Sequence, residues 1–252
     1  MAAETRPGPR KPFTIRCGDW LFKYRNLAFT AFLAALFIGF RPRPFLGDPG
    51  ADHWLDLAGI LVALAGSAFR FWVIGLAYIK RGGVNKKIHA DRLVVSGMFG
   101  VCRNPLYVGN ALVLLGLFLI HNNPWVYAIG LCVFGFSYWS MVVAEEWFLA
   151  QKFGDEYARY CADVTRFWPD FSRYSQAARG MVFNWRRSII KDYSSIVAWV
   201  ATVVALLTYE RVLWTGDTAE GFSMVVPGGL LLLAAIFLVT VRGLKKSGLL
   251  KE

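Results

Sequence analysis

The most constraining feature of this sequence is a series of apolar runs long enough to cross a lipid bilayer. Six apolar runs occupy residues 26–40, 54–79, 106–120, 125–144, 196–214 and 224–241, and the first is slightly short for a span unless Phe22 and Tyr24 extend it. A transmembrane helix needs about 20 apolar residues, because lipid forces the backbone to satisfy its own hydrogen bonds. Hydrophobic residues make up 56% of the chain and the mean hydropathy is +0.42, which excludes an ordinary soluble domain. The sequence therefore predicts an all-α integral membrane helical bundle with about six transmembrane helices.

The distribution of basic residues predicts how the bundle is oriented. Lysine and arginine are frequent in 1–25, 80–105, 145–193 and 242–252 and absent from 121–124 and 215–223. Cytoplasmic loops of membrane proteins carry an excess of these residues, so both termini are expected in the cytoplasm. Only Arg41 and Arg43 go against this pattern. The net charge of +11 fits loops beside anionic lipid and does not indicate nucleic-acid binding.

Three parts of the chain follow from this pattern. Residues 1–25 are expected to form a polar arm at the cytoplasmic surface, and 26–192 a membrane core with the candidate functional site within 90–170. Residues 193–252 add two C-terminal transmembrane helices. The four cysteines and three histidines are scattered without the spacing of a zinc site, so no metal site is predicted.

Polar segments bracket the third and fourth apolar runs. Arg103, Asn104 and Pro105 precede the third run, and Glu145 and Glu146 follow the fourth. Two antiparallel helices return the chain to the side it left, so we expect these residues to meet at one end of the hairpin. Proline suits the first turn of a helix, whose free N–H groups can bind an anion. One carboxylate could then hold the ammonium group of a ligand while the arginine holds its carboxylate.

An intramembrane arginine and three glycines are further candidates. Arg70 lies near the middle of the second run, where a charge is costly without a partner, so it is expected to face the bundle interior. A shorter helix with Arg70 near its cytoplasmic end is the alternative. Gly97, Gly100 and Gly109 leave room for a backbone or a ligand to approach closely. No GxGxxG, P-loop, GxSxG or HExxH motif occurs, so the residues alone indicate a polar pocket facing the cytoplasm.

Several short motifs follow one another in order between about residues 60 and 170. They are Gly66, Arg70 and Trp72, then 93–99, 103–109, Glu145-Glu146, 153–157, Tyr160, Val164, Arg166 and Pro169. Their order and spacing resemble the membrane methyltransferases that include isoprenylcysteine carboxyl methyltransferase and the phospholipid N-methyltransferases. This resemblance implies that S-adenosyl-L-methionine (SAM) binds on the cytoplasmic side and that the methyl acceptor arrives from the lipid.

By position, the resemblance also implies roles for individual residues. The cofactor site is expected to be formed by Leu93, Val94, Gly97, Phe99, Asn104, Pro105, Leu106, Tyr107 and Gly109, with Glu145 at the amino-acid end of SAM. Arg103 and Glu146 would complete the polar ring, and with Arg70 they are the predicted catalytic residues.

Two positions depart from the pattern of the family. Asn104 stands in place of a histidine, and an amide can hydrogen-bond but cannot titrate, so proton transfer at this position is excluded. Met141 stands four residues before Glu145, where the carboxyl methyltransferases have a substrate-binding arginine. Recognition of a carboxylate would then need Arg70 or Arg103.

The predicted function is SAM-dependent methyl transfer to a lipidic or isoprenoid-type acceptor at the cytoplasmic side of a multi-pass membrane protein. A phospholipid amine or a small thiol is the alternative acceptor, and for an amine Glu145 or Glu146 would be the base. The rival from another class is a transporter or a non-catalytic membrane scaffold. The sequence lacks the internal repeats of many transporters. Membrane lipids, and no nucleic acid, are the expected partners.

Overall fold

The protein is an all-helical bundle in the part of the chain that the computed structural model describes, residues 11–77, 83, 85, 87–215 and 225–249. Its long helices are α1 (Phe13–Gly39), α2 (Pro49–Leu76), α3 (Pro105–His121), α4 (Pro124–Asp163), α6 (Trp185–Thr215) and α7 (Val225–Lys246). Its short helices are η1 (Phe45–Gly47), η2 (Gly97–Gly100), η3 (Phe171–Arg173) and α5 (Tyr174–Ala177). Residues 1–10 of the predicted arm, 78–79 of the second predicted span, 80–82, 84 and 86 of the basic loop, and 224 lie outside the described residues.

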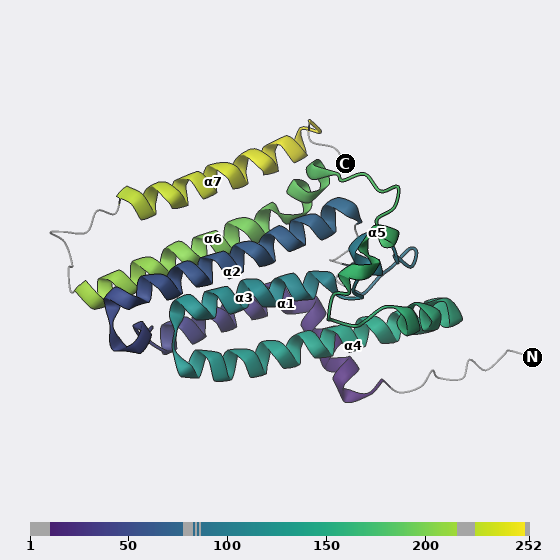
Figure 1. Ribbon diagram of the computed structural model, residues 1–252, viewed down its shortest axis with the longest axis horizontal. Coiled ribbons are helices and arrows are strands. Elements are labelled where there is room, and N and C mark those ends of the chain that lie inside the picture. The colour runs from purple at the N-terminus through teal and green to yellow at the C-terminus, as the bar shows by residue number, and fades with distance from the viewer. Residues whose placement is uncertain (1–10, 78–82, 84, 86, 216–224, 250–252) are drawn as a thin grey trace, which may run out of the picture.

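The long helices lie side by side (Figure 1), with α1 packed on α4, α2 on α3 and α6, and α6 on α7. Five helices (α1, α2, α4, α6 and α7) are long and apolar enough to cross a membrane, and α3 has 17 residues. At 1.5 Å per residue α3 reaches about 26 Å, slightly less than the hydrocarbon thickness. The prediction of a helical membrane bundle is confirmed, while the cytoplasmic position of both termini stays a prediction.

Several helices continue beyond the apolar runs that predicted them, and α1 and α4 show this clearly. Helix α1 begins at Phe13, so residues 13–25 of the predicted arm are helical, and Ile15 and Phe22 are buried. Helix α4 continues to Asp163, and inside it Gly154 has non-helical angles, with φ at +48°. Hydropathy marks only the part of a helix that contacts lipid, whereas the helical backbone satisfies its hydrogen bonds on either side of that boundary.

Glycines let α2 and α3 approach closely. A Cβ atom on Gly116 would lie 2.4 Å from the backbone oxygen of Gly59, and one on Gly66 would lie 2.7 Å from the oxygen of Gly109. In lipid the hydrophobic effect does not drive helices together, so they associate through close packing, which small residues at the contact allow. The contact fixes the position of α3, and therefore of the loop that enters it, relative to α2.

We expect Gly116→Ala to destabilise the protein, because the new methyl group meets backbone atoms of Gly59 and Ala63 that cannot move independently. Overpacking of this kind costs about 1–3 kcal/mol, which lowers the melting temperature by roughly 2–10 °C in a chain of this size. Gly135→Ala on α4 is the matched control, since a Cβ atom there meets nothing within 4 Å. Thermal unfolding of both purified variants in the same detergent measures the difference. Equal melting temperatures would contradict the close contact.

Candidate active site

Glu146 joins two arginines at the end of the α3–α4 hairpin. Arg103 Nη1 lies 3.2 Å from Glu146 Oε1, and Arg166 donates from Nε to Oε1 at 3.0 Å and from Nη2 to Oε2 at 2.6 Å. Arg103 also donates to the thiol of Cys161 at 2.7 Å. Because Arg103 precedes α3 and Glu146 belongs to α4, the two polar segments meet, as expected from antiparallel helices.

In this network Arg103 stays charged and has one N–H group without an acceptor in the described part of the chain. Burial works against the charge, but the carboxylate of Glu146 and other neighbours more than offset it, so the pKa of Arg103 is raised. Its Nε atom is buried and has no hydrogen-bond partner among the described residues. A buried polar atom without a partner is costly, so this N–H is available to an anionic group of a ligand.

Glu145 faces a different neighbour from Glu146. The hydroxyl of Tyr107 on α3 donates to Glu145 Oε1 at 2.8 Å, and the guanidinium of Arg25 on α1 is near enough to act on this carboxylate electrostatically. Successive residues of a helix point about 100° apart, which explains why the two adjacent glutamates reach separate partners. The site therefore offers one carboxylate held between two arginines and a second beside a tyrosine.

Hydrogen bonds join the segment after α4 to the residues just before α3. Arg103 donates its backbone N–H to the carbonyl of Thr165 at 2.8 Å, and Asn104 donates from Nδ2 to the carbonyl of Arg166 at 3.1 Å. Asn104 is the residue before the helix, and Pro105 occupies the first turn of α3, as predicted. Since the Asn104 side chain binds a backbone oxygen, it positions the loop after α4 and makes no cap for α3.

Cys102 is not a nucleophile in this arrangement. Its thiol is buried and donates to the carbonyl of Phe167 at 3.2 Å. Burial raises the pKa of Cys102 to about 11. The thiol therefore stays protonated near neutral pH, and only the thiolate reacts.

A groove of about 420 Å³ lies between the turn around η2, the end of α4 and α5. Its lining residues are Val95, Ser96, Gly100, Glu156, Tyr160, Asp163, Val164, Arg173, Gln176 and Ala177. The hydroxyl of Tyr160 donates to the carbonyl of Phe99 at 2.7 Å, which holds η2 against α4. The volume suits a small-molecule ligand.

The predicted cofactor residues of the turn, Leu93, Val94, Gly97 and Phe99, are not among the residues that line this groove. Val94, Phe99 and Leu106 pack in one apolar cluster with α2, whereas Leu93 packs against Tyr160 and its neighbours on α4. Gly97 has a φ of +63°, a conformation that glycine adopts without strain. These residues therefore fix the conformation of the turn, while Val95, Ser96 and Gly100 of the same turn line the groove.

Arg70 is buried between α2, α3 and α6, as its position in an apolar run predicted. It forms an ion pair with Asp192 and binds Asn110 and the Ser195 hydroxyl, the last at 3.1 Å. Gly109 makes room for it, since a Cβ atom there would lie 2.4 Å from Cγ of Arg70. These contacts give Arg70 a structural role at the junction of three helices.

Sequence reasoning missed two charged partners in this region. Arg166 was part of the family motif but was not predicted as a site residue, although a basic residue shortly after Glu145-Glu146 is a natural partner for them. Asp192 was also missed. It lies four residues before the apolar run 196–214, and that position gives no sign of which residue it pairs with.

Comparison with known proteins supports the family resemblance over part of the chain. The sequence model of the phospholipid methyltransferase family matches residues 55–156, which include Arg70, Arg103, Glu145 and Glu146. This match confirms the family resemblance over that part of the chain, and the five long apolar helices indicate an integral membrane protein.

One curated relative is similar over a shorter stretch. The cobalt-zinc-cadmium resistance protein CzcN of Cupriavidus metallidurans is 38% identical over 84 residues, which are 33% of this chain and 38% of that protein. This chain therefore spans less than two fifths of the length of that relative. No solved structure gave a significant match.

Proposed function

We propose that the protein transfers a methyl group from SAM to a lipid-type acceptor at one boundary of the membrane. The observation that carries the proposal is the ion pair of Arg103 with Glu146, the chain neighbour of Glu145, where α3 begins and the apolar part of α4 ends. All three residues lie in the stretch that matches the phospholipid methyltransferase family. The cytoplasmic orientation of this end is supported by the density of basic residues around it.

The donor set suits SAM, which carries a carboxylate, an ammonium group and ribose hydroxyls. The unpartnered Nε of Arg103 is suited to the carboxylate, and Glu145 to the ammonium group. Glu156 and Asp163 in the groove between η2 and α5 can accept from hydroxyl groups. When bound, SAM supplies an electrophilic methyl group on its sulfonium sulfur.

The residues of the chain then act by binding and alignment. Arg103 and Glu145 fix the polar end of the cofactor, and Glu146 holds Arg103 in place through its ion pair. The buried residues around η2 keep water from the reacting groups, which strengthens the electrostatic interactions there.

An apolar groove of about 450 Å³ offers a place for the acceptor chain. It is lined by Ala68, Phe71, Trp72, Leu76, Tyr174, Met181 and Phe183, between α2 and the segment around α5. Met141, where the related carboxyl methyltransferases have an arginine, is fully buried. A methionine cannot pair with a carboxylate, so we favour a phospholipid amine over a carboxylate as the group that is methylated. The resistance function in the name of CzcN is not part of this proposal, because the match covers a minority of both chains.

The test uses the purified protein in lipid nanodiscs with SAM labelled with tritium in its methyl group. We expect SAM to bind in calorimetry and label to enter a phospholipid, which mass spectrometry would show as a gain of one CH₂ unit. Label in a volatile product would indicate a small thiol as the acceptor, and label in a base-labile ester would indicate a carboxylate. Failure of the protein to bind SAM would favour a transporter or a scaffold.

A further inference from the structure

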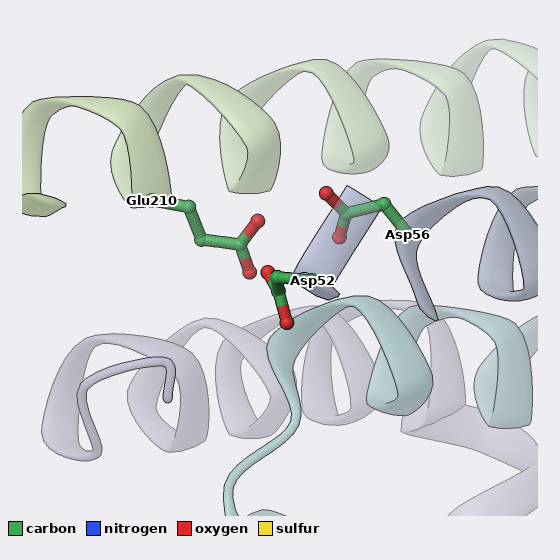
Figure 2. Close-up of side chains that lie close together, drawn as sticks. All are labelled: Asp52, Asp56 and Glu210. Carbon is green, nitrogen blue, oxygen red and sulfur yellow. The ribbon is translucent and has the colours of Figure 1, made fainter. Parts of the chain in front are cut away.

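Three carboxylates converge at the end of the bundle opposite the candidate active site. Asp52 and Asp56 lie near the start of α2, and Glu210 lies near the end of α6, at the left of Figure 1, whereas α5 is at the right. One oxygen from each residue can be chosen so that all three lie within 4.8 Å of one another. Figure 2 shows the three side chains pointing toward a common space between the two helices.

These carboxylates are buried and mostly lack protein partners. Asp52 is 0% exposed, Asp56 9% and Glu210 2%. Asp52 Oδ1 accepts the N–H of Phe45 at 2.7 Å. Among the residues that the structure describes, Asp52 Oδ2, Asp56 Oδ1 and both carboxylate oxygens of Glu210 are buried without a hydrogen-bond partner. Buried carboxylates are normally paired or bound to a metal. The two oxygens of Glu210 that accept no hydrogen bond from the described residues therefore point to a cation as their partner.

We propose that Asp52, Asp56 and Glu210 bind a calcium ion between α2 and α6. All the donors are carboxylate oxygens, which suit hard cations and not the softer metals that prefer histidine or cysteine. Oxygens on opposite sides of Ca²⁺ are about 4.6–5.2 Å apart, whereas those on opposite sides of Mg²⁺ are only about 4.0–4.2 Å apart. Three oxygens within 4.8 Å of one another can all contact one Ca²⁺ without movement of either helix. Mg²⁺ keeps several of its waters and is seldom bound by protein ligands alone, so a buried site made of carboxylates favours Ca²⁺.

The bound ion would join the C-terminal helices to the rest of the bundle. Asp52 and Asp56 lie on α2, and Glu210 lies on α6. Helix α6 also packs against α7. Without a cation, burial and mutual repulsion disfavour three charged carboxylates at one place, whereas Ca²⁺ binds their ionised forms and holds the two helices together. The role is structural and independent of methyl transfer.

The test is Ca²⁺ binding to the full-length protein in detergent after removal of metal with a chelator. We expect saturable binding of one ⁴⁵Ca²⁺ per chain. At a concentration near 100 times Kd, the melting temperature should rise by about 5 °C or more. Glu210→Gln keeps the size of the side chain and removes one charge, so Kd should rise at least ~10-fold, since carboxylate charge tunes calcium affinity.

Matched comparisons make the outcome decisive. Asp155→Asn removes a carboxylate that is exposed on α4 and should leave Ca²⁺ binding unchanged. In the chelator, Glu210→Gln should melt no lower than the native protein, which shows that the variant folds. Absence of saturable Ca²⁺ binding to the native protein, equal affinity of the native protein and Glu210→Gln, or equal affinity for Mg²⁺ would overturn the proposal.

Discussion

A Glu145→Gln variant is expected to bind SAM about 100-fold more weakly than the native protein, or not at all, while keeping its fold. Glutamine retains the oxygen that accepts from the Tyr107 hydroxyl, so the contact between α3 and α4 survives. It loses the negative charge proposed to pair with the ammonium group of SAM. Hydrogen bonds to charged groups contribute about 1.5–3 kcal/mol, and 1.4 kcal/mol is a factor of ten in affinity.

Tyr107→Phe is the matched control for this variant. It removes the hydroxyl and leaves the charge of Glu145 in place, so SAM affinity should fall by less than about tenfold. Calorimetric titration of both variants measures the two effects, and thermal unfolding confirms that each is folded. Native affinity in Glu145→Gln would rule out this carboxylate as a ligand of the cofactor.

An Arg70→Met variant is expected to unfold far more readily than the native protein. It removes the guanidinium that pairs with Asp192, a residue whose side chain is completely buried. Breaking a buried ion pair by removing one partner costs about 3–5 kcal/mol, because the remaining charge stays in a region of low dielectric. In a chain of this size the melting temperature should fall by roughly 6–20 °C.

The double variant Arg70→Met/Asp192→Asn separates the ion pair from other roles of Arg70. With both charges removed, most of the lost stability should return, since a neutral pair in place of a buried ion pair is often close to neutral in free energy. Melting temperatures of the two variants in one detergent test this expectation. If Arg70→Met melts like the native protein, the ion pair contributes nothing to folding. Methyl transfer by the stabilised double variant then shows whether Arg70 also acts on the substrate.

The features of the fold that could be predicted from the sequence were those that lipid imposes. The apolar runs located six long helices, and the cost of a buried charge placed Arg70 inside the bundle. The ends of α1 and α4 could not be predicted in this way. Residues 13–25 and 145–163 are polar enough to leave the membrane, and a polar helix gives no hydropathy signal where it begins or ends.

Contacts between helices that are distant in sequence were the least predictable part. The hairpin places Arg103 beside Glu146 because its two helices are consecutive and antiparallel. By contrast, the pairing of Arg70 with Asp192 depends on how α6 returns across α2. The same return of the chain brings Glu210 to Asp52 and Asp56. No local pattern encodes either contact.

The length of α4 has a consequence for what the protein can modify. Its 40 residues extend over about 60 Å, twice the thickness of the hydrocarbon layer, and Glu145 lies ~30 Å along the helix from Pro124. If α4 enters the bilayer at Pro124, the two glutamates stand at the level of the lipid headgroups on the other side. Chemical groups deep among the acyl chains would then be out of reach, and the acceptor atom must belong to the polar surface of the leaflet.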